Sequence, residues 1–182
     1  MRDLRSTVRA LRERGGSLSE PYCDGFHLEP PSGERWPKGL PASPLLREFY
    51  AECDGGELGS FSFLPLEELA EETESVLDWM EGNTDPGARP KAGRCVMFGH
   101  NEYSHALIWD ADRDAVLIYD SDGGDIWDAD ETTLAYDGSG PGATGRLTLA
   151  QFFERLVNPA ADAGDEVSRE WAEALRLLDP RD

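Results

Sequence analysis

Aspartates recur at alternate positions in two short runs of this chain, residues 110–114 and 120–125. Carboxylates spaced in this way supply the first ligands of a calcium-binding loop, which also needs a glycine at its sharp turn and a glutamate at its end. Ala115 stands where that glycine would be and Ser121 where that glutamate would be, and the second run departs similarly. We therefore predict no dedicated metal site, and at most weak, adventitious binding of a divalent cation.

Two other patterns resemble sites for cofactors or catalysis. Residues 140–145 match the spacing GxGxxG, but no second parallel strand is predicted after them, and a phosphate would meet a strongly negative field. The three histidines and Cys95 lack a recognised ligand spacing, and Cys95 lies in a predicted apolar strand, which favours a buried structural cysteine. Carboxylates are so abundant that no pair stands out as a general acid and base. The sequence therefore predicts a protein that is not an enzyme and holds no cofactor.

The chain is strongly negative, with 37 Asp plus Glu against 17 Lys plus Arg and a net charge of −20. The first 50 residues are nearly balanced, so the excess falls on the remainder. A field of this kind repels nucleic acid and anionic membranes and attracts basic proteins. The alternative is that the acidity only keeps the protein soluble and monomeric.

An internal repeat places the acidic runs in a predicted sheet, because the segment Ile-Trp-Asp-Ala-Asp occurs at residues 108–112 and again at 126–130. Each copy is predicted to be a strand that runs out into an acidic turn, and we expect the turns to gather their carboxylates at one rim. Like charges held together raise one another's pKa and cost stability until a cation or basic partner arrives. Trp109 and Trp127 would be aromatic anchors there, with core packing as the alternative for each. The predicted partner-binding residues are Asp110, Asp112, Asp120, Asp122, Asp125, Asp128, Asp130, Trp109, Trp127, Glu68, Glu71 and Glu72.

The elements that must position these residues begin with a basic amphipathic helix, predicted by the apolar stripe of residues 4–11. We expect this helix to dock on the acidic body of the protein rather than on a membrane. Prolines predict an extended, irregular course for residues 17–44, with one strand near residues 26–28.

A second helix is predicted from the cap residue Ser43 and from Pro44, which suits the first helical position, to the glycine pair at residues 55–56. A short strand over residues 61–64 and a helix over residues 65–80 follow. The outer face of that helix carries the first group of acids.

The apolar pattern then changes to short runs at residues 95–98, 106–109 and 116–119, which predict an antiparallel meander. Thr148 caps a further helix, and a last helix is predicted over residues 165–178. This order of elements predicts a single α+β domain in which helices pack on a meander sheet.

The three cysteines, Cys23, Cys53 and Cys95, show no CxxC spacing, which argues against a disulfide framework and suits a reducing cytosol. The N-terminus lacks an apolar segment of signal-peptide length, and no stretch approaches the roughly 20 apolar residues that span a bilayer. We predict a cytoplasmic protein that does not enter membranes.

Several short motifs keep a fixed order along the chain. They are Leu40-Pro41, then Leu45, Phe49 and Tyr50, then Asp54-Gly55-Gly56, then Leu64-Pro65-Leu66-Glu67-Glu68-Leu69, and finally Phe152-Phe153-Glu154-Arg155-Leu156. From Leu40 to about Val157 this order resembles the SUKH superfamily of Smi/Knr-type domains. The resemblance implies an α+β fold and a binding function without chemistry. Bacterial members of that family are mostly immunity proteins that neutralise toxins, many of them nucleases, and fungal relatives act in cell-wall regulation.

The resemblance divides the chain into a basic and proline-rich extension (1–39), a SUKH-like domain (40–157) and a C-terminal helix packed on it (158–182). Two departures are that Asp54 stands where the family more often has asparagine, and that residues 1–39 are not covered. The implied function is that of a monomeric, non-enzymatic immunity protein that binds a basic, nuclease-type toxin domain. The alternatives are a regulatory or scaffolding protein without a toxin partner, a nucleic-acid mimic, and an unrecognised hydrolase.

Overall fold

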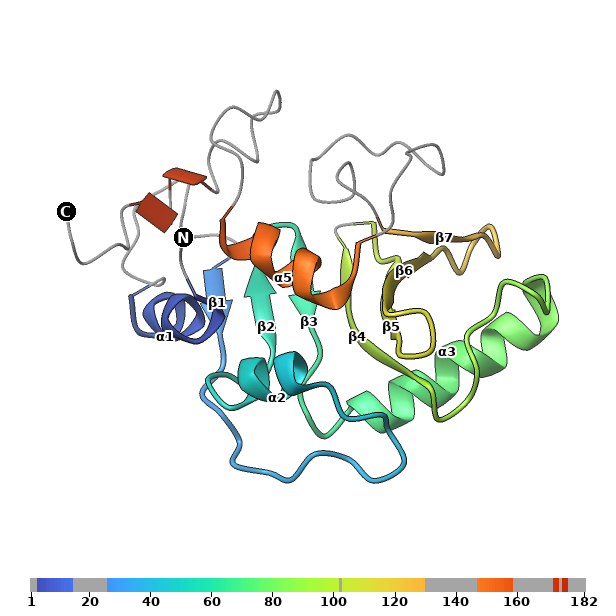
Figure 1. Ribbon diagram of the computed structural model, residues 1–182, viewed down its shortest axis with the longest axis horizontal. Coiled ribbons are helices and arrows are strands. Elements are labelled where there is room, and N and C mark those ends of the chain that lie inside the picture. Colours follow the sequence, from blue (N-terminus) through green and yellow to red (C-terminus); the bar gives the residue numbers. More distant parts are fainter. Residues whose placement is uncertain are drawn as a thin grey trace.

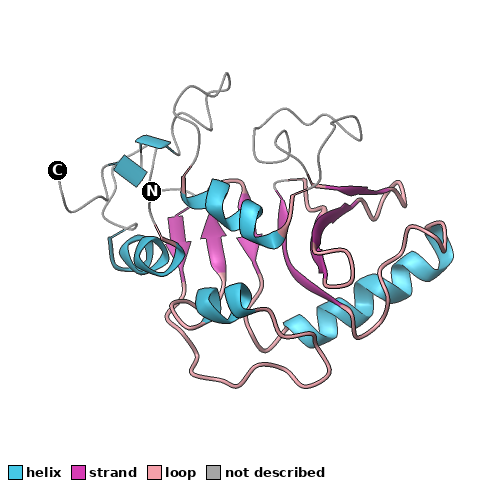
Figure 2. Cartoon of the chain, viewed as in Figure 1, coloured by secondary structure: helices cyan, strands magenta, loops and turns pink. Residues whose placement is uncertain are grey.

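The computed structural model describes residues 3–14, 26–101, 103–129, 147–158, 172–173 and 175–176. Within them, seven strands form one sheet, and helices pack against it (Figure 1, Figure 2). The strands are β1 (Phe26–Leu28), β2 (Gly56–Leu58), β3 (Phe61–Phe63), β4 (Cys95–Asn101), β5 (Ala106–Asp110), β6 (Ala115–Tyr119) and β7 (Ile126–Asp128). The helices are α1 (Leu4–Arg14), α2 (Pro44–Tyr50), α3 (Leu69–Asn83) and α5 (Leu149–Val157). The predicted α+β single domain with an antiparallel meander sheet is confirmed.

The strands stand in the sheet in their chain order, and every neighbouring pair is antiparallel. In the chain, α2 lies between β1 and β2 and α3 between β3 and β4, so the meander is interrupted twice without a change of strand order. The sequence pattern missed β2, which begins at Gly56, within the glycine pair that was expected only to end α2.

The N-terminal helix α1 is docked on the body, as expected. Its apolar side is buried, and it contacts α2, β1 and α5. Arg5 and Arg9 bind the carboxylate of Glu52 with nitrogen–oxygen distances of 3.2 and 2.7 Å, and Arg12 donates to the Glu52 carbonyl. Glu52 is only 4% exposed and lies two residues after the end of α2, so one buried residue binds Arg5, Arg9 and Arg12 of α1.

Two helices begin at the residues that the sequence indicates. The Ser43 hydroxyl accepts a hydrogen bond from the Leu46 backbone N–H (3.4 Å), and Pro44 is the first residue of α2. At the start of α5, Thr148 and Gln151 form a reciprocal capping box, which satisfies backbone N–H groups that a helix terminus leaves open.

One face of the sheet is covered by α2 and α5, which lie across it in Figure 1. The ring of Phe49 in α2 lies 4.7 Å from that of Phe63 in β3 and 5.5 Å from that of Phe153 in α5. Phe98 of β4 packs edge-on against Phe152 of α5, with ring centroids 5.7 Å apart. Each of these buried rings contributes on the order of 1.5–3 kcal/mol, so this cluster is the main apolar core.

The long helix α3 packs against β4 on the other face. The Thr73 hydroxyl accepts a hydrogen bond from the Met97 backbone N–H (2.9 Å) and donates to the Leu69 carbonyl (2.6 Å). Met97 adjoins a β-bulge in β4, and the bulge leaves this N–H available to the helix. None of the helices that the structure describes has the length and apolar character needed to cross a bilayer.

Several expectations fall outside the described residues: the helix over 165–178 apart from four positions, the GxGxxG segment at 140–145, Cys23 and Asp130. The four described positions, 172–173 and 175–176, are helical, and Leu175 is buried.

Candidate functional site

The acidic turn at residues 120–125 lies at the opposite end of the strands from the turns that follow the two copies of the repeat, so the predicted acids do not all share one rim. At one end Asp110 pairs with Ala115 across the β5–β6 turn, and at the other Tyr119 pairs with Ile126 across the β6–β7 turn. The two copies of the repeat do run in the same direction, because β5 and β7 flank the antiparallel β6. The acids at residues 120–125, however, follow β6 and therefore lie at the far end.

At the β5–β6 end, the carboxylates are already engaged within the protein. Asp110 is 2% exposed, and its carboxylate accepts hydrogen bonds from the backbone N–H groups of Asp112 and Arg113 (2.9 and 3.2 Å). Asp112 pairs with Arg94 (2.6 Å) and Lys91 (3.5 Å), and the hydrogen bond from Arg94 lowers the pKa of that carboxyl group. These two predicted partner-binding residues therefore stabilise a turn.

The two predicted tryptophan anchors are mostly covered. Trp109 is 9% exposed, and its indole N–H donates to the Asp114 carboxylate (3.2 Å). Trp127 is half-buried, with its ring edge-on to His105 at 5.6 Å. Trp109 thus follows the core-packing alternative.

Among the residues that the structure describes, the exposed large aromatic side chains are different ones, Trp79 at 58% and Tyr103 at 49%. Trp79 lies on α3 beside the buried Met80 but outside the apolar stripe of that helix. An aromatic residue on the polar face of a predicted helix is a sequence pattern that could have pointed to Trp79 as a binding residue. Tyr103 lies in the turn between β4 and β5, where no sequence pattern indicated an exposed aromatic residue.

At the β6–β7 end, a groove of about 230 Å³ lies between α3 and the sheet. It is lined by residues from α3, β4, the β4–β5 turn, the start of β5, the end of β6 and the β6–β7 turn. The lining residues include Glu72, Trp79, His100, Ser104, Tyr119 and Asp122. The groove thus brings together one acid from each of the two groups that the sequence singled out.

The groove is negatively charged and has no cationic side chain among its lining residues. Neither Glu72 nor Asp122 forms an ion pair within the described part of the chain. Burial lowers the pKa of His100, against a smaller opposing effect of Glu72, so this imidazole is neutral at pH 7. Two carboxylates and a neutral histidine leave an uncompensated negative field.

The other described acids that were predicted to bind a partner do not line the groove, and they lie at different places around it. Glu68 and Glu71 are exposed, at the cap and in the first turn of α3, on the same helix as Glu72. Asp120 accepts a hydrogen bond from the Asp122 backbone N–H (2.9 Å), and Asp125 is exposed in the same turn. Asp128 is exposed in β7, opposite Leu117 and away from that turn, and Asp130 is outside the described residues.

The groove also contains hydroxyl groups in unusual settings. Tyr119 is 1% exposed, and its buried hydroxyl has no hydrogen-bond partner. Ser104 has a φ of 63°, in the left-handed region where a residue with a side chain is uncommon. The Asn101 side chain holds this turn, because its oxygen accepts from the backbone N–H groups of Tyr103 and His105 (3.0 and 2.9 Å).

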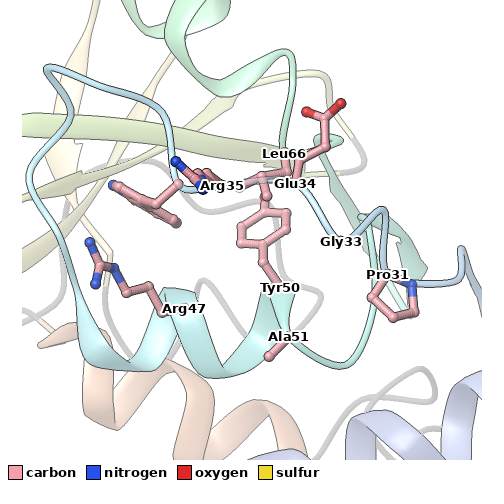
Figure 3. A pocket seen from close by; sticks show the side chains of 9 residues that line it. Pro31, Gly33, Glu34, Arg35, Arg47, Tyr50, Ala51 and Leu66 are labelled. Atoms are coloured by element: carbon pink, nitrogen blue, oxygen red, sulfur yellow. The ribbon is translucent and has the colours of Figure 1, made fainter.

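A second hollow, of about 610 Å³, lies beside α2 and has the opposite character (Figure 3). Arg35 and Arg47 line it, and the Arg47 guanidinium lies 5.9 Å from the centre of the Trp36 ring. Tyr50 also lines it, but the Tyr50 hydroxyl donates to the Leu64 carbonyl (2.8 Å). Two arginines in a wide hollow do not suit a basic partner, so this hollow is not part of the acidic site.

The described cysteines are unsuited to nucleophilic chemistry. Burial raises the pKa of both the Cys53 and the Cys95 thiol to about 12, so the reactive thiolate is scarce at neutral pH. The prediction that Cys95 is a buried residue of a strand is confirmed. In the part of the chain that the structure describes, no three histidine, cysteine or acidic residues cluster as metal ligands would.

Comparisons with protein-family models, with curated proteins and with solved structures found no match to this chain.

Proposed function

We propose that this protein is a non-enzymatic module that binds a basic protein through the acidic face formed by α3 and the β6–β7 turn. The observation that carries the proposal is the groove that Glu72 and Asp122 both line, with no cationic side chain among its lining residues. Carboxylates held together in this way repel one another, and a cationic side chain of a partner would relieve that repulsion.

The exposed aromatics support the same face. Trp79 lines the groove, and Tyr103 belongs to the turn that carries Ser104. Binding hot spots are enriched in tryptophan, tyrosine and arginine, surrounded by groups that exclude water. An exposed tryptophan beside two carboxylates therefore fits a partner that presents cationic side chains.

The physiological role that we propose is immunity to a toxin, with a basic nuclease-type domain as the partner and the cytoplasm as the location. Support for this role comes from the resemblance of residues 40–157 to the SUKH superfamily. Electrostatic attraction would also suit it, since acidic complementarity speeds association toward about 10⁸–10⁹ M⁻¹s⁻¹ at low salt. The same binding face would serve a regulatory protein, so the identity of the partner decides between the two roles.

The test is affinity capture of the tagged full chain from its own cells at low and high salt, with mass spectrometry of the bound proteins. We expect one basic, toxin-like protein that is lost as the salt concentration rises. The double variant Glu72→Gln/Asp122→Asn should weaken its binding by at least about tenfold, because it removes the charges of the groove. Recovery of ordinary cellular proteins alone, or of none, would contradict the immunity role.

A matched control is the double variant Asp112→Asn/Asp128→Asn, which changes the net charge equally but away from the groove. Asp112 is already paired with Arg94 and Lys91, so we expect capture close to that of the unchanged protein. Equal losses in the two double variants would show that only the overall charge matters, and would contradict the groove as the binding site. Displacement of the captured protein by DNA would indicate that it is a nucleic-acid-binding protein.

A further inference from the structure

The strongest anomaly in the groove is the hydroxyl of Tyr119. Tyr119 is 1% exposed and lines the groove, and its hydroxyl is buried without a hydrogen-bond partner. Most buried polar side-chain atoms in folded proteins are hydrogen-bonded, because an unpaired one has lost its water and gained nothing. Another buried tyrosine, Tyr50, follows this rule, since its hydroxyl donates to the Leu64 carbonyl at 2.8 Å.

The charges around Tyr119 decide which kind of ligand could form a hydrogen bond with its unpaired hydroxyl. Glu72 from α3 and Asp122 from the turn after β6 line the same groove, so an anionic ligand would be repelled. A cationic donor suits these charges, and the buried tyrosine oxygen can accept a hydrogen bond from it once the side chains that cover the hydroxyl move aside. A partner with several N–H groups is favoured, because two carboxylates and a hydroxyl offer acceptors in different directions.

The size and the lining of the groove further restrict which ligand it can bind. Its volume of about 230 Å³ lies below the roughly 300–1,000 Å³ typical of small-molecule and cofactor pockets. One long side chain fits this size better than a cofactor does. The exposed Trp79 forms one wall, and an aromatic ring attracts a guanidinium over its face.

Ser104 supplies a second sign that the groove is shaped for a ligand. Its φ of 63° costs energy that a glycine would avoid, and such strain is concentrated at functional sites. Ser104 lines the groove, where its hydroxyl can serve as a further acceptor.

We infer that this groove is the receptor for a single arginine side chain of the basic partner, whose guanidinium donates to the Tyr119 hydroxyl between Glu72 and Asp122. The inference rests on the proposed function, because the arginine belongs to the protein that the module binds. Arginine is favoured over lysine, since its planar fork of five N–H donors reaches several acceptors and stacks on tryptophan.

The test uses the full chain and two small probes, L-argininamide and L-lysinamide, titrated while amide resonances are recorded by NMR. Argininamide should shift the resonances of Ser104, Tyr119 and Ser121, and should bind at least about threefold more tightly than lysinamide. Shifts spread over all acidic surfaces, or equal affinities for the two probes, would overturn the arginine site.

The decisive variant is Tyr119→Phe, which removes only the unpaired hydroxyl. It should weaken argininamide binding about tenfold, the loss of one hydrogen bond to a charged group, and yet raise the melting temperature by about 2–4 °C. Tyr50→Phe is the matched control, because it removes a satisfied hydroxyl. It should lower the melting temperature by a similar amount and leave argininamide binding unchanged. If Tyr119→Phe lowers the melting temperature and binds argininamide normally, the inference is wrong.

The outcomes separate this inference from the proposed function. If argininamide binds in the groove but no basic protein is captured from cells, the proposed function fails and the arginine site stands. If a basic protein is captured through Glu72 and Asp122 but Tyr119→Phe alters neither its affinity nor the melting temperature, only the arginine site fails.

Discussion

At the scale of single residues, the glycine pair after α2 shows how closely local geometry is specified. Gly55 has a φ of +79° and Gly56 a φ of +110°, both in the region that residues with side chains rarely adopt. Space is also lacking, because a Cβ on Gly55 would lie 2.5 Å from the Phe63 carbonyl oxygen and one on Gly56 would overlap the carbonyl oxygen of His27. The pair thus allows the end of α2 to approach both neighbouring strands.

We predict that Gly56→Ala destabilises the protein by more than about 3 kcal/mol, since backbone strain and overlap with β1 add together. The measurement is urea unfolding monitored by circular dichroism. Gly59→Ala is the matched control, because its φ is +63° but a Cβ there meets nothing within 4 Å. It should cost only about 1–2 kcal/mol, the penalty of the left-handed backbone alone. Equal costs for the two variants would mean that close strand approach contributes nothing.

At the same turn, Asp54 can be used to test whether a negative charge is needed or only a hydrogen-bond acceptor. Its carboxylate accepts a hydrogen bond from the Leu66 backbone N–H (2.8 Å), which ties the end of α2 to the segment before α3. An asparagine could accept the same hydrogen bond through its side-chain oxygen. We predict that Asp54→Asn changes the free energy of unfolding by less than about 0.5 kcal/mol, and that Asp54→Ala lowers it by about 1–2 kcal/mol. Thermal unfolding of both variants checks this. A large loss in Asp54→Asn would show that the charge itself is needed.

At the scale of elements, the helices were easier to predict than the site. Ser43 with Pro44 and Thr148 with Gln151 are local signals, and the structure uses them where the sequence places them. Strand direction is not local. The repeat at 108–112 and 126–130 shows two similar strands, but only the pairing of β6 between them reveals that the turn at 120–125 lies at the opposite end.

The groove escaped prediction for the same physical reason. Its lining comes from α3, β4, β6 and two turns, which are brought together only when α3 packs on the sheet. The acids Glu72 and Asp122 were among the predicted binding residues, but nothing in their spacing indicated that they share one site. Tyr119 belongs to an apolar run, VLIY, so its unpaired hydroxyl has no signature in the sequence.

The docking of α1 gives a prediction at the element scale, through Glu52. Hydrogen bonds from Arg9 and Arg5 lower the pKa of this carboxyl group from its usual value of about 4.5. A lowered folded-state pKa means that the stabilisation is present above about pH 4.5 and is lost as the pH falls through the folded-state value. We expect acid to loosen α1 before it loosens the aromatic core around Phe49. Hydrogen exchange of the α1 amides at pH 7 and pH 3.5 would measure this loosening.

Glu52→Gln should abolish the loosening of α1 at low pH, and it should lower the free energy of unfolding by about 1–2 kcal/mol at pH 7. The cost is below the 3–5 kcal/mol of a fully buried pair because Arg5 and Arg9 are about half exposed. The control is Glu13→Gln, which removes an exposed partner of Arg12 and should change stability by less than about 1 kcal/mol. An unchanged pH profile in Glu52→Gln would show that another group controls the docking of α1.

At the scale of the whole molecule, one net charge acts on two equilibria with opposite signs. A net charge of −20 on 182 residues opposes the compact state by self-repulsion, and the same field attracts a basic partner. Salt shortens the range of both effects, from about 30 Å at 0.01 M to about 8 Å at 0.15 M. Folding and binding should therefore respond to salt in opposite directions.

We predict that the melting temperature of the free protein rises by several degrees between about 0.01 and 0.15 M NaCl, while the affinity for the basic partner falls over the same range. Ion pairs with an exposed arginine, such as Arg9–Glu52, weaken with salt, but ion pairs open to solvent contribute little to stability, so the excess of like charge decides the sign. The comparison variant is Glu67→Gln/Glu71→Gln/Asp78→Asn, which neutralises two exposed acids of α3 and one in the turn before it. It should melt higher than the unchanged protein at low salt and gain less from added salt. Differential scanning calorimetry at matched pH measures both curves. A melting temperature that falls with salt would mean that the ion pairs outweigh the repulsion, and that the acidity of this chain has little cost to its fold.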